Sequence, residues 1–288
     1  MPGARARLLP DGRRLHLQHG PVDVVLEAWG EPGEVAAAYR QAAAAFEGVL
    51  DGLVAELPLL RRPVTDATPE PSGPVARRMV RAVRPHRAVF VTPMAAVAGA
   101  VADHVLERAT DGRRLERAYA NDGGDIALHL SPGTVLTLGM VADVEQPRLD
   151  GTLAVRAADP VRGVATSGRG GRSLSLGIAD AVTVLARDAA AADAAATLIA
   201  NAVDLPGHPA VERVPAAEID PDSDLGDLPV TVAVGALRPG GVAAALAAGA
   251  AEAERMRADG LIVAVGLWLR GSFAAVGPLP RLHADAAG

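Results

Sequence analysis

The chain of 288 residues contains no cysteine and no lysine. Without cysteine it has no disulfide, no thiolate metal ligand and no cysteine nucleophile. Without lysine it has neither a Schiff-base residue nor the lysine of a P-loop, and arginine supplies all its strong bases. Aromatic residues make up only 2% of the chain, which is too few for the stacking platforms of single-strand nucleic-acid binders.

Charge and hydropathy exclude further classes of protein. The formal net charge is −6, which argues against binding to nucleic acid by phosphate neutralisation. No run of about 18 apolar residues is present, so we expect no membrane span. No apolar segment typical of a secretory signal follows the basic residues 1–14. We therefore expect a cytoplasmic protein that binds neither nucleic acid nor membrane, and an oligomer is compatible with the sequence.

The pattern of apolar residues predicts both helices and antiparallel strands. Strand pairs with turn residues between them are expected at 5–19 and 261–276, and a series of strands at 115–186. Spacings of three and four predict helices over 34–57, 75–83, 95–109, 188–203 and 241–259. We predict an α+β fold, a mostly antiparallel sheet with packed helices, in one domain over 1–288. Residues 58–74 and 204–229 are expected to be long loops, and 281–288 a loose C-terminal tail.

A run of turn residues, Asn121-Asp122-Gly123-Gly124-Asp125, lies between two predicted strands. Glycines allow a ligand to approach the main chain, and amides of a Gly-Gly turn can cradle an anion. Asn121 and Asp125 would add polar groups to such a contact. The same residues are also typical of a plain hairpin turn, and both interpretations stay open.

A second glycine-rich segment follows the predicted strand at 163–166. Thr166 and Ser167 precede a loop that contains Arg169 and Arg172. Hydroxyl groups, main-chain amides and guanidinium groups together can grip a phosphate. A solvated polar loop has the same composition, and the residues alone do not separate the two.

Two short patterns on predicted helices complete the candidates. Asp193 and Thr197 are four residues apart, so they share one helix face and could together hold a hard cation such as Mg²⁺. An exposed aspartate beside an ordinary threonine is the alternative. Residues 93–100 form a small-residue helix start that could admit a ligand, or that packs closely on its neighbours.

In this order the segments resemble the ApbE-like flavin transferase superfamily. The family order is a small-residue Ala-Gly helix, then Asn-x-Gly-Gly-Asp-Ile, then Ala-Thr-Ser-Gly, then Asp-Ala-x-x-Thr. In this chain these are residues 95–99, 121–126, 165–168 and 193–197. The resemblance implies an ApbE-like α+β fold and a Mg²⁺-dependent site for FAD. It also implies transfer of the FMN half of FAD to a Thr or Ser of an acceptor protein, with release of AMP.

The resemblance carries roles to individual residues. The implied metal ligands are Asp193 and Thr197. The implied adenosine-side contacts are Asn121, Gly123, Gly124 and Asp125, and the implied pyrophosphate loop contains Thr166 and Ser167.

The chain also departs from the family pattern. The Lys-Gly of the small-residue helix is Ala98-Gly99 here, and the His-x-x-Asp-Pro segment is replaced by residues 173–180, which contain no histidine and no Asp-Pro. Asp180 stands near the missing acid, so we assign it as general base or third ligand. The alternative function is a flavin- or nucleotide-binding protein that has lost the transferase chemistry.

Overall fold

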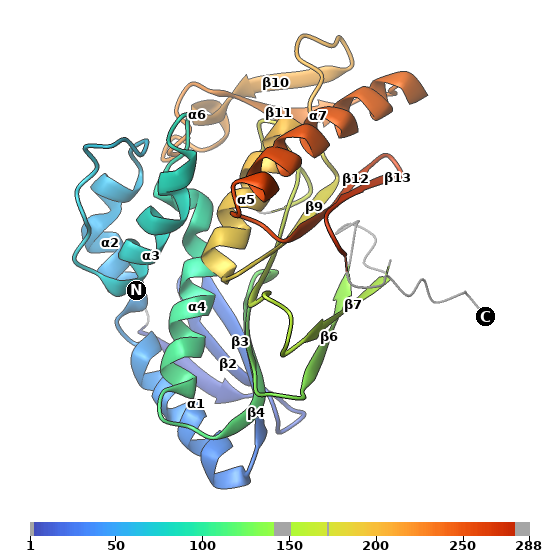
Figure 1. Cartoon of the computed structure of the whole chain (residues 1–288). Helices are drawn as coiled ribbons and strands as arrows, with labels where there is room; N and C mark the ends of the chain where they lie inside the picture. Colours follow the sequence, from blue (N-terminus) through green and yellow to red (C-terminus); the bar gives the residue numbers. More distant parts are fainter. Residues whose placement is uncertain (1–2, 141–150, 172, 280–288) are drawn as a thin grey trace. The chain divides into compact units, whose positions relative to one another are not determined.

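The computed structural model describes residues 3–140, 151–171 and 173–279 (Figure 1). The strands are β1 (Arg5–Leu8), β2 (Leu15–His19), β3 (Val22–Gly30), β4 (Leu115–Asp122), β5 (Asp125–Leu130), β6 (Val135–Met140), β7 (Gly151–Arg156), β8 (Gly163–Ser167), β9 (Ala181–Ala186), β10 (Val211–Pro215), β11 (Pro229–Val234), β12 (Ala264–Leu269) and β13 (Ser272–Val276). The helices are α1 (Pro32–Phe46), α2 (Val49–Leu60), α3 (Pro74–Val83), α4 (Val97–Thr110), α5 (Ala189–Ala202), α6 (Ala216–Ile219) and α7 (Pro239–Ala258), with short turns η1 (Arg84–His86) and η2 (Pro93–Ala96). Among these helices, none is long and apolar enough to cross a membrane.

The fold is α+β, as the sequence predicts. Hydrogen bonds join nine strands in the order β1-β2-β3-β4-β5-β8-β9-β12-β13. Successive strands from β1 to β5 pair antiparallel, as do β5 with β8 and β12 with both β9 and β13. Two further pairs, β6–β7 and β10–β11, form separate small sheets. The prediction of a mostly antiparallel sheet with packed helices is confirmed.

The chain divides into two compact units, which are described separately. The first contains residues 1–136, 156–165 and 186–194, and the second contains 137–155, 166–185 and 195–288. The prediction of one domain over 1–288 stays a prediction. The predicted tail at 281–288 lies outside the described residues.

In the first unit, α1 and α4 cover one face of the strands β2 to β5 (Figure 1). Alternate residues of the strands point into this core: Leu17 pairs with Val24, and Leu26 pairs with Ala120. All four are fully buried, and Phe46, two alanines of α1 and three alanines of α4 are buried with them. Small alanine side chains fill little volume, so the helices come close to the sheet and to each other.

In the second unit, α7 packs on the hairpin of β12 and β13. A Cβ at Gly249 of α7 would lie 2.3 Å from the Val203 side chain and 2.9 Å from that of Leu267. All six residues of β9 are buried. The second unit therefore repeats the helix-on-hairpin packing with a core of small aliphatic residues.

One predicted helix is two helices. The pattern over 34–57 predicts a single helix, but α1 ends at Phe46 and α2 begins at Val49 after Gly48. Glycine is a poor helix former and lets the chain change direction between the two. Pro58 does not end α2, which continues to Leu60.

The segment 204–229 contains regular structure that the sequence pattern does not predict. It includes β10 and α6, and β10 pairs antiparallel with β11. Pro215 and Pro229 stand opposite each other where this small sheet ends. Proline cannot donate a ladder hydrogen bond, so it is suited to that place. The prediction of one long loop is wrong here, and the connection between α2 and α3 covers 61–73, which is shorter than the predicted 58–74.

Candidate functional site

The Gly123-Gly124 pair forms the two-residue turn of the β4–β5 hairpin. Asp122 and Asp125 face each other in the register, and the two glycines have φ of 65° and 114°. These angles belong to the region that glycine enters without strain. The Asn121 side-chain oxygen accepts a hydrogen bond from the Gly124 amide at 2.8 Å. The turn interpretation is confirmed, and a nucleotide contact by Asn121, Gly123, Gly124 and Asp125 stays a prediction.

The carboxyl groups beside this turn are buried. Asp122 is 4% exposed and Asp125 is 9% exposed. Burial of carboxylates is costly unless hydrogen bonds or opposite charges compensate. Two buried carboxyl groups thus lie at the tip of one hairpin.

Asp193 brings a third carboxyl group to the hairpin. It lies on α5, half-buried, and its Oδ2 accepts a hydrogen bond from the Gly99 amide at 3.0 Å. Burial raises the pKa of Asp193 well above its usual range, and the negative charges of Asp125 and Asp122 raise it further. The amides of Gly99 and Ala98 act in the opposite direction. Asp193 and the Asp122–Asp125 turn are thus electrostatic neighbours.

Gly99 is required by a close approach of two main chains. A Cβ at this position would lie 2.3 Å from the Ala189 carbonyl oxygen and 2.8 Å from the Ala190 nitrogen. Backbone atoms cannot move away as a flexible side chain can. The small residues at the start of α4 therefore allow α4 to meet the start of α5, and the packing interpretation of residues 93–100 is confirmed.

The start of this helical segment has the predicted cap. The Thr92 hydroxyl accepts a hydrogen bond from the Met94 amide at 3.2 Å, and Pro93 occupies the first position of η2. Threonine followed by proline is typical of a helix N-terminus.

Asp103 is a functional candidate that the sequence patterns miss. Its two carboxylate oxygens accept hydrogen bonds from the amides of Ala189 at 3.0 Å and Ala190 at 2.9 Å, at the start of α5. Burial raises its pKa to about 7, with a further contribution from the charge of Asp188. Asp188 itself accepts a hydrogen bond from the Ala191 amide at 2.8 Å. Only Asp188 could be recognised from the sequence, as an ordinary N-cap, because Asp103 reaches α5 from a different helix.

The remaining predicted metal ligand, Thr197, lies one helical turn after Asp193 on α5 and is half-buried. Within residues 3–140, 151–171 and 173–279, no three His, Asp or Glu side chains are arranged to hold a metal ion. A cation at Asp193 would therefore need oxygen ligands of other kinds. The metal role of Asp193 and Thr197 stays a prediction.

In the second unit, Thr166 and Ser167 end β8. The Thr166 hydroxyl lies 2.8 Å from the hydroxyl of Thr183 on β9. Thr166 is exposed and Ser167 is half-buried. Their predicted contact with a pyrophosphate stays a prediction.

Arg169 and Asp180 form an ion pair in the second unit, with the Arg169 Nη2 and the Asp180 Oδ1 3.0 Å apart. Asp180 also accepts a hydrogen bond from the Arg270 amide. Arg270 has a φ of 51°, which is unusual for a residue other than glycine, at the β12–β13 turn. Asp180 therefore holds both the loop after β8 and this turn. Its role as general base or third ligand stays a prediction, and Arg172 lies outside the described residues.

Comparison with known proteins places the chain in a family. Residues 6–275 match the family model described as AbpE bacteria. This range is most of the chain, and the protein belongs to that family of α+β proteins. The resemblance expected from the sequence motifs is confirmed.

Proteins similar in sequence to this chain include UPF0280 proteins of archaea. The one from Archaeoglobus fulgidus is 34% identical over 142 residues, covering 49% of this chain and 55% of that protein. The one from Methanopyrus kandleri is 39% identical over 154 residues, covering 53% and 59%. The chain thus spans little more than half the length of these relatives. A solved structure of a variant of the flavin transferase ApbE from Vibrio cholerae superposes with a TM-score of 0.49 at 12% identity, covering 95% of this chain and 96% of that one.

Proposed function

We propose that this protein binds a flavin dinucleotide together with Mg²⁺ beside the β4–β5 hairpin, and that it transfers the FMN half of FAD to a threonine or serine of an acceptor protein. The observation that carries the proposal is the gathering of Asp193 with Asp122 and Asp125 next to the Gly123-Gly124 turn. Membership of the AbpE family supports it.

The charges at this place favour a cation. Three carboxyl groups from a helix and a hairpin repel one another when ionised, and a divalent cation would offset that repulsion. Asp193 keeps part of its surface exposed. Mg²⁺ takes one or two protein carboxylates and fills its octahedron with waters and phosphate oxygens. A site without a protein cage of three acidic residues fits that preference.

Different residues of the chain would bind the cation, the nucleotide and its phosphates. Asp193, with the Thr197 hydroxyl one turn further along α5, would hold the cation. The glycine turn, with no side chains, would let the nucleotide approach the main chain. Thr166, Ser167 and Arg169 are the proposed phosphate contacts. When bound, Mg²⁺ would supply stabilisation of the negative charge that develops on the departing AMP.

The transfer breaks the pyrophosphate bond of FAD and forms a phosphoester with the acceptor hydroxyl. The hydroxyl proton leaves to a base, and AMP is the other product. Asp180 is the proposed base. Its carboxylate is engaged in an ion pair with Arg169.

That ion pair favours a second candidate function, a flavin- or nucleotide-binding protein without transferase activity. Residues 173–180 lack the His-x-x-Asp-Pro segment of the family, and this also favours a binding protein without transferase activity. In this case the site would hold the dinucleotide intact.

Incubation with FAD, Mg²⁺ and a hydroxyl acceptor peptide separates the two functions. AMP detected by chromatography, and dependent on Mg²⁺, supports transfer. FAD binding measured by titration calorimetry without any AMP supports the second function. No heat with FAD, FMN or ADP, with or without Mg²⁺, would rule out both.

A further inference from the structure

A cavity of about 200 Å³ lies in the first unit, alongside α4. An engineered protein cavity of ~150 Å³ accepts a benzene molecule, so this one has room for a ligand of that size or slightly larger. The charged and polar side chains in its wall come from α3, α4, β5 and the segment before β8: Arg78, Asp103, Glu107, Thr110, His129 and Arg162. Asp193 is not part of this wall, so the cavity differs from the proposed nucleotide site.

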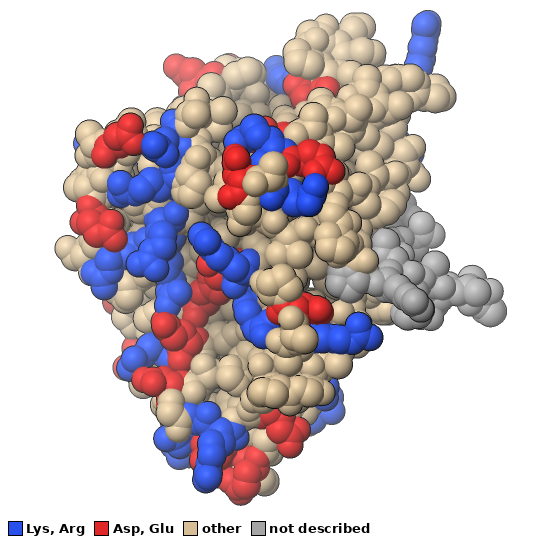
Figure 2. Space-filling model, viewed as in Figure 1, with Lys and Arg blue, Asp and Glu red and all other residues tan. Residues whose placement is uncertain are grey.

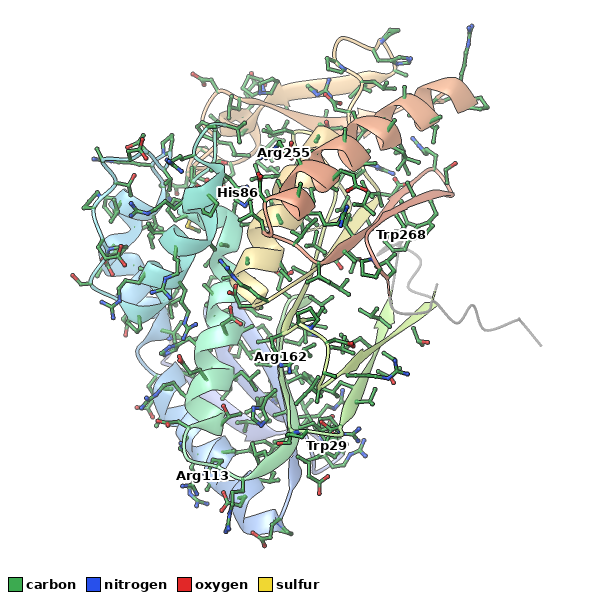
Figure 3. The ribbon with its side chains drawn as sticks, in the orientation of Figure 1. Trp29, His86, Arg113, Arg162, Arg255 and Trp268 are labelled. Atoms are coloured by element: carbon green, nitrogen blue, oxygen red, sulfur yellow. The ribbon has the colours of Figure 1, made fainter. Side chains whose placement is uncertain are left out.

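Arg162 carries a positive charge that no carboxylate in the described part of the chain neutralises. Its Nη1 donates hydrogen bonds to the carbonyls of Asp159 at 2.8 Å and Val161 at 2.6 Å, and its Nη2 donates to that of Ala157 at 2.7 Å. A guanidinium has five N–H donors, so these contacts leave two of them available. The three carbonyls fix the orientation of the group, because a planar fork with three bonds cannot turn freely. Figure 3 shows Arg162 beside α4.

The two acidic residues of the wall are already engaged. Glu107 forms an ion pair with Arg78, and Asp103 accepts the amides of Ala189 and Ala190. Figure 2 shows acidic and basic side chains interleaved over the face that carries α3 and α4. Of the two arginines in the wall, Arg162 is therefore the one that forms no ion pair within the described residues.

His129 adds a hydrogen-bonding group next to this charge. Burial lowers its pKa, and the charge of Arg162 lowers it further, although the Leu115 carbonyl acts in the opposite direction. The contact with the Leu115 carbonyl uses one ring N–H, so the imidazole serves as a neighbour that senses the charge of Arg162 and not as a second anchor for an anion.

We infer that this cavity binds a small oxyanion, a carboxylate or a phosphate group, with the Arg162 guanidinium as its anchor. Hydrogen bonds between guanidinium and such oxyanions are charge-assisted and stronger than neutral ones. The site is separate from the proposed flavin site, so it would add a second ligand to the protein.

The test follows the His129 imidazole by NMR during titrations with inorganic phosphate and with acetate. The signal is assigned by comparison with His129→Gln. A saturable change, with a His129 pKa that rises in the bound state, is expected with at least one anion, because the anion offsets the charge of Arg162. Loss of one charge-assisted contact of ~1.5–3 kcal/mol converts to a weakening of about tenfold or more in Arg162→Gln.

Two further variants, Thr110→Phe and Asp193→Asn, accompany Arg162→Gln in the test. Arg162 holds the segment 157–161 in place, so Arg162→Gln is used only if its circular dichroism matches that of the parent. Thr110→Phe, which fills the cavity and leaves Arg162 in place, should also abolish the response. Asp193→Asn should keep it.

Three outcomes would overturn the inference. One is no saturable change at His129 with either anion. Another is unchanged affinity in a folded Arg162→Gln or in Thr110→Phe. The third is a phosphate response that Asp193→Asn loses and Arg162→Gln keeps, because that would place the anion at the nucleotide site.

Discussion

Asp193 of α5 accepts an amide hydrogen bond from the first turn of α4, and Asp103 of α4 accepts two from the first turn of α5. Each helix thus supplies the cap of the other. Amides at helix starts have no partner within their own helix, and the positive end of the helix dipole favours a carboxylate there. This exchange fixes α4 against α5 at the place where Asp193 meets the β4–β5 hairpin.

The burial of Asp103 predicts a dependence of stability on pH. The pKa of Asp103 is raised from 3.8 to about 7 in the folded protein, so the folded state binds this proton more tightly than the unfolded state. Its contribution is fully present below about pH 4 and is lost as the pH rises through about 7, with a slope of up to ~1.4 kcal/mol per pH unit.

Urea unfolding of the parent and of Asp103→Asn over this range checks the prediction. Other carboxyl groups, Asp193 included, are common to both proteins and largely cancel. The free energy of unfolding of the parent minus that of the variant should fall between about pH 4 and 7, and be level above about pH 8. A difference that stays constant with pH would contradict a raised pKa at Asp103.

The approach of α4 to α5 predicts a large effect of one methyl group. Gly99→Ala places a Cβ 2.3 Å from the Ala189 carbonyl oxygen, so the two helix starts must separate. Overpacking of this kind costs about 1–3 kcal/mol of unfolding free energy, and the hydrogen bond from Gly99 to Asp193 should weaken with it.

Gly52→Ala in α2 is the matched control, since nothing lies within 4 Å of a Cβ there. It should stabilise the protein by about 0.5–1 kcal/mol, because alanine is the better helix former. Equal effects of the two substitutions in denaturant unfolding would show that the helices do not meet as described.

The proposed role of Asp180 predicts a difference between two variants of one ion pair. As general base, Asp180→Asn should lower AMP release by about 100-fold or more and leave FAD affinity within about threefold. Arg169→Gln breaks the same ion pair from the other side and keeps the carboxylate. It should weaken FAD binding and leave more activity than Asp180→Asn. Equal loss of turnover in both would mean that the ion pair, and not proton transfer, is what matters.

Much of the fold follows from local patterns in the sequence. Thr92-Pro93 marks the start of a helical segment, and Gly123-Gly124 between two apolar runs marks a hairpin, because caps and two-residue turns depend on neighbours in the chain. The strand β10 was harder to predict, since it is stabilised by pairing with β11 and not by its own residues.

The candidate site was likewise only partly predictable from local sequence patterns. The Asp193–Thr197 spacing is visible in the sequence, and so is the glycine turn. The link from Asp193 to Gly99, and the cap that Asp103 provides for α5, depend on how two helices pack. No spacing rule reaches across separate elements, so these contacts, like the ion pair that engages Asp180, required the structure.

The central claim is that Asp193 holds a divalent cation together with the flavin dinucleotide. Electron paramagnetic resonance of Mn²⁺, used in place of Mg²⁺, tests it most directly by counting bound ions with and without FAD. Asp193→Asn keeps the size and one oxygen of the side chain, and Asp188→Asn, at the neighbouring N-cap, is the control. The account predicts one Mn²⁺ per chain in the presence of FAD for the parent and the control, with loss of this ion in Asp193→Asn. Equal Mn²⁺ binding by the parent and Asp193→Asn, or no FAD-dependent ion in the parent, would contradict it.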